Sequence, residues 1–103
     1  MIQGHLKIAR HRILVTGRVK GVGFRYHVLK LAGKCHLGGF VANYPEGVQI
    51  EIEGTDDNLD LFLKSLRSNP PLFSKITDLR VSPVSLCGDK KFQVMPNLES
   101  STP

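Results

Sequence analysis

The residue types between positions 15 and 28, VTGRVKGVGFRYHV, are those of a loop that binds a small anion. Glycine loses the most backbone freedom on folding, and three glycines within seven residues exceed what one turn needs. Main-chain N–H groups in such a loop, together with the positive end of a following helix, bind phosphate-sized anions. The guanidinium of Arg25, which follows the loop, can donate two parallel hydrogen bonds to phosphate oxygens. The segment therefore predicts a phosphate-binding site.

Nucleotides and nucleic acids are less favoured anions for this site. The segment has neither the Gly-Lys-Ser/Thr ending of a Walker loop nor a G-x-G-x-x-G dinucleotide fingerprint. The chain carries 14 basic and 9 acidic residues, a formal net charge of +5, which favours anionic partners. The basic residues are spread along the sequence with little aromatic interleaving, so we expect no nucleic-acid partner.

Arg25 and Asn43 are the candidate catalytic residues, and each has a structural alternative. A positive charge at the start of a helix opposes the helix dipole unless an anion is bound, so a binding role is favoured for Arg25. Asn43 lies two residues before Pro45, where an asparagine often caps a turn. From residue chemistry alone, capping and catalysis are equally good interpretations of Asn43.

Metal and disulfide chemistry are not indicated. The histidines do not pair at the spacing of helical metal ligands: His5, His11, His27 and His36. Cys35 and Cys87 could form one bridge, but two free buried thiols are favoured over a bridge, and their pairing stays open. We expect no metal site.

The elements that would position the loop follow from local patterns. The segment RILVTG predicts a strand that stops at Gly17. Apolar residues then recur at helical spacing, which predicts a helix from near Arg25 to near His36. These apolar residues are Val28, Leu31, Ala32 and Cys35.

A hairpin, a second helix and further strands follow. Residues 44–47 suit a turn, and the alternation over residues 48–53 predicts a strand with its apolar side chains buried and with Gln49, Glu51 and Glu53 exposed. Residues 54–71 predict a helix with a threonine or aspartate cap and a double-proline stop. Strands are predicted in residues 75–86 and, marginally, 90–94.

This order predicts an α+β fold, a ferredoxin-like βαββαβ sandwich. Its four- to five-stranded antiparallel sheet would carry two helices on one face. We expect a basic N-terminal extension over residues 1–10, one domain over residues 11–95 and a C-terminal tail over residues 96–103. No apolar run approaches the ~20 residues of a membrane-spanning helix, and the start lacks the features of a secretory signal. A cytoplasmic monomer is therefore expected.

Two separated motifs resemble those of the acylphosphatase family, which are a G-x-V-x-G-V-x-F-R loop and a G-x-V-x-N strand before a turn ending in glycine. The first is matched by Gly17, Val19, Gly21, Val22, Phe24 and Arg25. The second is matched by Gly39, Val41, Asn43 and Gly47. The resemblance covers about residues 11 to 95 and implies the same ferredoxin-like fold.

The resemblance implies hydrolysis of acyl phosphates to a carboxylate and inorganic phosphate, without metal or cofactor. Arg25 would bind the phosphoryl group through its side chain, and Asn43 would orient the attacking water. The substrate's own phosphate would accept the proton of that water. The phosphoryl oxygens would be held by the loop residues Arg18, Val19, Lys20, Gly21, Val22, Gly23 and Phe24. For Val22 and Phe24, packing is the favoured role.

The sequence departs from the family pattern at two positions. Lys20 stands where a glutamine is usual, and His36 stands where many members have a glycine at the end of the helix. Substrate preference and local stability depend on these two positions.

Two other functions stay open. One is a domain that handles carbamoyl phosphate, because VGFR and PPLFSKI also resemble the N-terminal acylphosphatase-like domain of the large carbamoyltransferase that matures nickel-iron hydrogenases. Tyr26 stands where a proline is common in that domain. The other is a non-enzymatic module that binds phosphate groups of RNA or of a partner protein.

Overall fold

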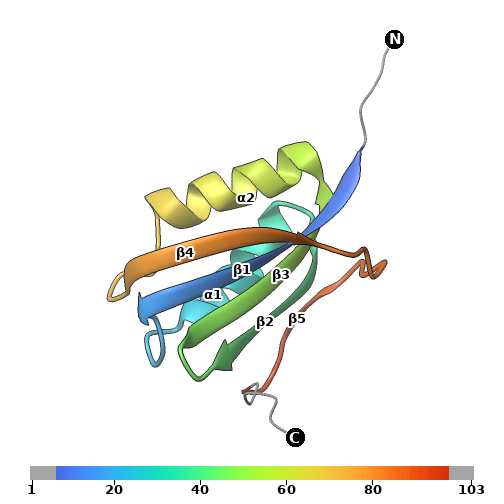
Figure 1. Cartoon of the computed structure of the whole chain (residues 1–103). Coiled ribbons are helices and arrows are strands. Elements are labelled where there is room, and N and C mark those ends of the chain that lie inside the picture. The colour runs from blue at the N-terminus through green and yellow to red at the C-terminus, as the bar shows by residue number, and fades with distance from the viewer. Residues whose placement is uncertain (1–6, 98–103) are drawn as a thin grey trace, which may run out of the picture.

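The computed structural model describes residues 7–97 and has the predicted βαββαβ order with a short fifth strand (Figure 1). Its elements are β1 (Ile8–Arg18), α1 (Phe24–Lys34), β2 (Gly38–Tyr44), β3 (Gly47–Thr55), α2 (Asp56–Ser68), β4 (Lys75–Val84) and β5 (Phe92–Val94). Strand β1 begins at Ile8, within the segment predicted as an N-terminal extension. Residues 1–6 and 98–103, which hold most of the predicted extension and tail, lie outside the described residues.

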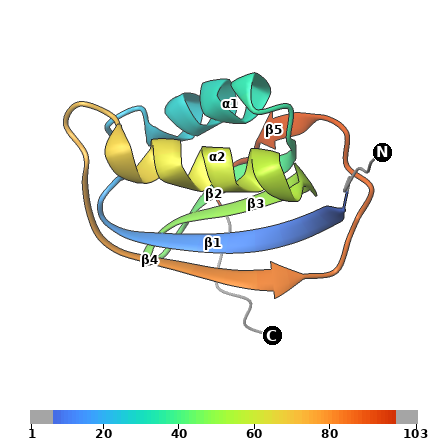
Figure 2. The ribbon, with the colours of Figure 1, turned by 90° about the horizontal axis from the view of Figure 1, so that it is seen from above.

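The strands form one sheet in the order β4-β1-β3-β2-β5. Strand β1 pairs antiparallel with β3 and β4, and β2 pairs antiparallel with β3. The prediction of an antiparallel sheet is wrong for the last pair, because β5 runs parallel to β2. After β4 at one edge the chain crosses to the other edge over residues 85–91, and this crossover brings β5 in along the direction of β2. Both helices cover one face of the sheet (Figure 2).

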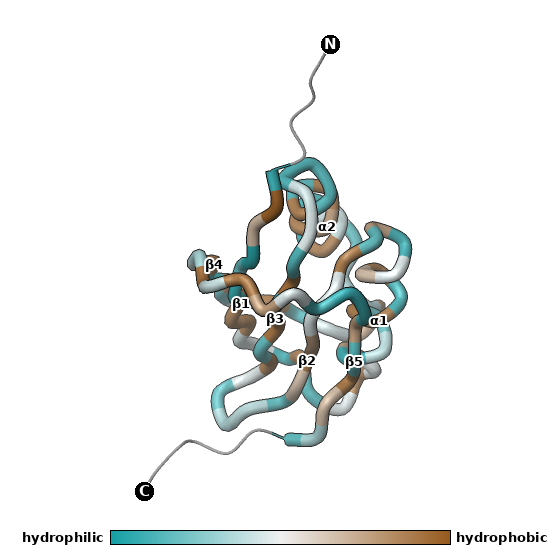
Figure 3. The backbone as a smooth tube through the Cα atoms, turned by 90° about the vertical axis from the view of Figure 1, so that its right-hand side faces the viewer, coloured by the Kyte–Doolittle hydropathy of each residue, from teal (hydrophilic) through white to brown (hydrophobic). Residues whose placement is uncertain are grey.

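The core between helices and sheet contains the apolar residues that the periodicities single out. Helix α1 buries Val28 and Ala32, and α2 buries Leu59, Phe62 and Leu66. Strands β1 and β3 supply Ile13, Val15, Val48, Ile50 and Ile52. Hydrophobic and hydrophilic residues are interspersed along both helices (Figure 3), as expected for elements with one buried face. The predicted cap of α2 is also confirmed, since the Thr55 hydroxyl accepts a hydrogen bond from the Asn58 N–H at 3.3 Å.

The opposite face of the sheet holds a buried ionic cluster that the sequence analysis did not predict. The prediction of an exposed Glu51 and Glu53 is wrong, since both are 7% exposed. The Arg10 guanidinium donates to Glu51 at 2.7 Å, to Glu53 at 2.9 Å and to Asp89 at 3.0 Å. We call these four residues the Arg10 cluster. Alternation places residues 51 and 53 away from the helices. There Glu51 is bonded by Arg10 and Arg12 of β1, and a segment from outside the pattern covers Glu53.

That covering segment is the connection between β4 and β5. The Glu53 carboxylate accepts hydrogen bonds from the Cys87 N–H at 2.8 Å and the Gly88 N–H at 2.9 Å. Burial opposes ionisation of Glu53, but the donors from Cys87, Arg10 and Gly88 outweigh it, so the pKa of this carboxyl lies below its usual value. The cluster thereby fastens the connection that carries the chain from one sheet edge to the other.

Neither thiol within residues 7–97 is in a disulfide. Cys35, the C-cap residue of α1, is buried, whereas Cys87 is exposed in the β4–β5 connection. The prediction of free thiols is confirmed, and the prediction that both are buried is wrong for Cys87. None of the helices in the described part of the chain is long and apolar enough to span a membrane.

His36 has a φ of 55°, which confirms that the end of α1 requires a left-handed residue. A left-handed conformation costs a residue with a Cβ about 1–2 kcal/mol, and glycine avoids this cost while losing more chain entropy. We therefore expect His36→Gly to raise the free energy of unfolding by about 0.5–1 kcal/mol. Urea unfolding measures this change. Lys30→Gly, in the regular part of α1, is the matched control and should lower stability by about 1 kcal/mol. If both variants changed the free energy of unfolding in the same direction, the left-handed backbone at His36 would not be the cause of the effect.

Candidate active site

The loop between β1 and α1 has the backbone that its glycines predict. Gly21 and Gly23 have φ angles of 74° and 76°, in the left-handed region. A Cβ at either position would meet nothing within 4 Å, so these glycines serve the backbone conformation and not a close contact. Gly17 differs, because its φ is 125° at an irregularity between β1 and β4 and a Cβ there would collide with the Lys75 carbonyl. The loop thus needs left-handed residues where it turns towards α1.

The start of α1 is free to interact with an anion. Gly23 occupies the N-cap position and offers no side-chain cap, and the first turn contains no acidic residue. The first N–H groups of a helix have no partner within the helix and carry a partial positive charge. Helix α2 provides the contrast, because Thr55 caps it and Asp56 and Asp57 lie in its first turn. The dipole of α1 is therefore unneutralised by its own residues.

A cavity of about 130 Å³ lies at this helix start. It is lined by Val19, Gly21, Gly23, Phe24, Arg25, Tyr26 and Asn43. The fold thus places Arg25 and Asn43, 18 positions apart in the sequence, on the same cavity. Of the other predicted loop residues, Arg18, Lys20 and Val22 do not line it. Tyr26 also lines the cavity, although the sequence patterns indicated no role for it. Its place next to Arg25 in the sequence was the one feature that could have indicated this.

Arg25 is partly buried and held in place by the C-terminal part of the domain. Its Nη1 donates a hydrogen bond to the Met95 carbonyl at 3.1 Å. Met95 follows β5 directly, and its N–H bonds the Val41 carbonyl of β2 at 2.8 Å. Within residues 7–97 the guanidinium makes no other side-chain hydrogen bond, so most of its donors remain available to a ligand. The bond to the Met95 carbonyl therefore orients the guanidinium and leaves its other N–H donors free for a ligand.

Asn43 lies near the end of β2, where it pairs with Val48 of β3. Its side chain makes no hydrogen bond to any residue of the described chain, so no contact supports the alternative that it caps the turn. An amide at the cavity wall has both a donor and an acceptor to offer a water molecule or a substrate oxygen.

Lys20 joins the loop to the neighbouring hairpin. Its Nζ donates to the Pro45 carbonyl at 3.0 Å, in the turn between β2 and β3. This bond ties the loop to the strand pair that carries Asn43. The positive charge at this departure from the family pattern is thus directed at the turn and not into the cavity. Val22 packs partly against the core and Phe24 is 2% exposed, in accordance with packing roles.

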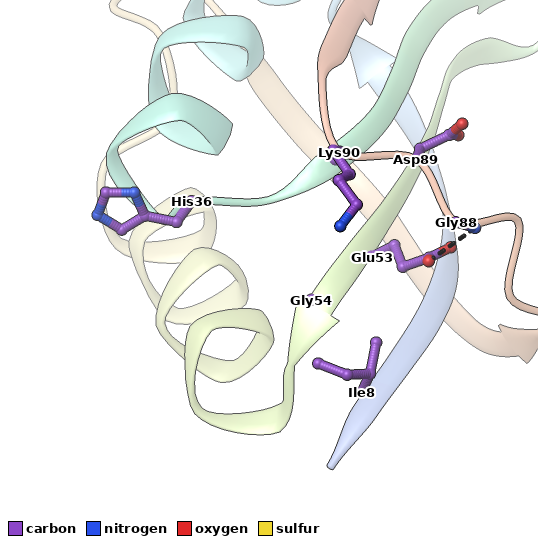
Figure 4. Close-up of a pocket in the computed structure, with 8 residues that line it drawn as sticks. Ile8, His36, Glu53, Gly54, Gly88, Asp89 and Lys90 are labelled. Atoms are coloured by element: carbon purple, nitrogen blue, oxygen red, sulfur yellow. Dashed lines mark hydrogen bonds between the residues drawn. The ribbon is translucent and has the colours of Figure 1, made fainter. Parts of the chain in front are cut away.

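A second, larger cavity of about 360 Å³ lies at the other end of β1, beside the Arg10 cluster. Figure 4 shows Ile8 of β1, Glu53 of β3 and Lys90 of the β4–β5 connection around it. Both oxygens of Glu53 accept hydrogen bonds from within the chain. Among residues 7–97 no group of three or more histidines, cysteines, aspartates or glutamates could hold a metal ion. Glu53 is therefore engaged within the chain, and we assign no metal site to this cavity.

The sandwich belongs to the class of ferredoxin-like domains, and comparisons with known proteins identify the family. The family model described as Acylphosphatase matches residues 11–94. An acylphosphatase of Bacillus licheniformis is 45% identical over 87 residues, which cover 82% of this chain and 96% of that protein. The crystal structure of an acylphosphatase from Bacillus subtilis superposes with a TM-score of 0.80 at 41% identity, over 86% of this chain and 99% of that one. The chain belongs to the acylphosphatase family and is an enzyme.

A longer protein contains a similar domain. The crystal structure of full-length HypF in its phosphate- and nucleotide-bound form superposes with a TM-score of 0.91 at 33% identity. The match covers 94% of this chain but 13% of that one. The carbamoyltransferase HypF of Rhizobium leguminosarum bv. viciae is 37% identical over 91 residues, which cover 88% of this chain and 12% of that protein. The fold is therefore shared with both small acylphosphatases and one part of HypF.

Proposed function

We propose that this chain hydrolyses acyl phosphates, the mixed anhydrides of a carboxylic acid and phosphoric acid, to a carboxylate and inorganic phosphate. The observation that carries the proposal is the cavity that joins the start of α1, Arg25 and Asn43. Residues 11–95 would form the catalytic unit, acting as a monomer in the cytoplasm. The family membership supports this chemistry, and the cavity that Arg25 and Asn43 share supports the roles proposed for them.

In the proposed mechanism the loop and Arg25 bind the phosphoryl group. The N–H groups of the cavity-lining residues Gly21, Gly23 and Phe24, together with the first turn of α1, donate to its oxygens. The Arg25 guanidinium donates to the same group while the Met95 carbonyl fixes its position. These donors neutralise the charge that spreads over the phosphoryl oxygens in the transition state.

Asn43 would orient the attacking water on the other side of the phosphorus. The bond from the water oxygen to phosphorus forms while the bond from phosphorus to the acyl oxygen breaks, and the carboxylate leaves with the electron pair. A phosphoryl oxygen takes the proton of the water, because an amide is a poor base. An acyl phosphate already has a good leaving group, so positioning and charge stabilisation account for the catalysis without a metal or cofactor.

The test is hydrolysis of benzoyl phosphate by the purified chain without added metal. The parent should hydrolyse it far faster than buffer, and Asn43→Ala should lower kcat about a hundredfold or more, the scale of removing one positioned polar group. Asn58→Ala is the matched control, because Asn58 lies on α2 away from the cavity and uses its backbone N–H for the helix cap. A parent no faster than buffer would refute the proposed function. A fully active Asn43→Ala would refute only the role of Asn43.

A second candidate is a domain that acts on carbamoyl phosphate. The observation that favours it is the superposition on HypF, whose TM-score of 0.91 and coverage of 94% of this chain exceed the 0.80 and 86% with the acylphosphatase of Bacillus subtilis. Carbamoyl phosphate places the same phosphoryl group next to a smaller, polar acyl group. Comparing kcat/KM for carbamoyl, acetyl and benzoyl phosphate decides between the candidates, because a specialised domain should prefer carbamoyl phosphate to both.

A further inference from the structure

The acyl group of the substrate lies towards the mouth of the cavity at the start of α1. In the proposed mechanism the phosphoryl group binds at the helix start, inside a cavity of about 130 Å³. The acyl group leaves opposite the attacking water, so it extends away from the helix start towards the opening. The mouth of the cavity therefore decides which acyl groups the enzyme accepts.

Tyr26 is the one large exposed side chain among the described residues that line this cavity. Its exposure is 63%, whereas Val19 and Phe24 are 1% and 2% exposed and belong to the core. The remaining lining residues are two glycines, Arg25 and Asn43, which the proposed mechanism already uses. The apolar surface available to an acyl group at the mouth is therefore the ring of Tyr26.

The position of Tyr26 on α1 directs its ring to the mouth. It is the third residue of the helix and follows Arg25. Side chains of a helix lean towards its N-terminus, which here is the anion-binding end. Its hydroxyl makes no hydrogen bond within residues 7–97, so no internal contact accounts for a tyrosine at this place.

We propose that the ring of Tyr26 forms an acyl subsite that favours aromatic and other apolar acyl phosphates over acetyl phosphate. The inference rests on the proposed function and names its substrate class. An aromatic acyl group packs against the ring, and this contact adds to the phosphoryl interactions that all acyl phosphates share. Arg25 and Asn43 then supply the chemistry while Tyr26 supplies selectivity.

The experiment compares kcat/KM for benzoyl phosphate and acetyl phosphate in the parent, Tyr26→Ala and Tyr26→Phe. The ratio of the two values isolates the acyl group, because the phosphoryl group is the same. We expect Tyr26→Ala to lower the ratio about three- to tenfold, the scale of one aromatic contact, and Tyr26→Phe to keep it. Leu61→Ala is the matched control, because Leu61 is an exposed apolar residue of α2 that does not line the cavity.

Inhibition by inorganic phosphate separates a subsite from a structural role. The inhibition constant of phosphate should be the same in Tyr26→Ala and the parent, because this product contacts the loop and not the ring. If Tyr26→Ala leaves the ratio of kcat/KM for the two substrates unchanged, Tyr26 forms no acyl subsite. The same conclusion follows if Tyr26→Ala weakens phosphate inhibition and lowers kcat/KM equally for both substrates. A parent that hydrolyses neither substrate instead overturns the proposed function and the subsite with it.

Discussion

Replacing Arg25 with alanine is expected to lower kcat/KM for benzoyl phosphate about a thousandfold, and lysine should restore only a small part of that loss. Lysine keeps the positive charge but offers a single ammonium, whereas the guanidinium can donate two parallel hydrogen bonds to the phosphoryl oxygens. The planar group is also held by the Met95 carbonyl at 3.1 Å, and a shorter, rounder ammonium cannot keep this anchor and reach the ligand together.

Steady-state kinetics of both variants test this expectation, and the inhibition constant of inorganic phosphate shows whether the lost contact is one with the phosphoryl group. Arg67→Ala is the matched control, since Arg67 is an exposed arginine in the last turn of α2 and does not line the cavity. Arg67→Ala also removes one positive charge, so a general electrostatic effect would lower the activity of both Arg67→Ala and Arg25→Ala. Near-normal turnover of Arg25→Lys would contradict the bidentate role.

The second large effect concerns stability, because Glu53→Gln should lower the free energy of unfolding by about 1–3 kcal/mol. The substitution removes one of the carboxylates that compensate the charge of Arg10, a residue that is 3% exposed. Glutamine also has a single acceptor oxygen where the carboxylate serves the Arg10 guanidinium and the N–H groups of Cys87 and Gly88. A buried charge that loses a partner is far more costly than a surface ion pair that does so.

Urea unfolding at pH 7 measures this loss. Glu46→Gln is the matched control, because Glu46 is exposed in the turn between β2 and β3 and should change stability by less than about 0.5 kcal/mol. Similar losses in the two variants would contradict a special role of the Arg10 cluster.

The same carboxylate makes stability depend on pH. The folded-state pKa of Glu53 lies below its unfolded value, so the stability it contributes is present above the unfolded pKa, about 4.3, and is lost as the pH falls towards the folded pKa. The parent should therefore lose stability below about pH 4.3 more steeply than Glu53→Gln. Parallel pH profiles of the two proteins would argue against a depressed pKa at this site.

Local sequence patterns determined most of the architecture and the loop. The helical spacing that ends in Ala32 and Cys35 and the alternation of Val48, Ile50 and Ile52 predict elements that the structure contains, because each pattern is set by the residue's own helix or strand. The glycines at positions 21 and 23 likewise indicate a left-handed backbone, since φ is a property of the single residue.

Pairing between distant segments was decided by the tertiary structure alone. The crossover of residues 85–91 makes β5 parallel to β2, places Met95 against Arg25 and buries Glu53 on the face away from the helices. The volume of the cavity and the presence of Tyr26 on its wall depend on the same packing. The physical reason is that the sequence encodes each residue's local backbone preference and polarity, whereas burial and contact also depend on the segments that fold over that residue from elsewhere in the chain.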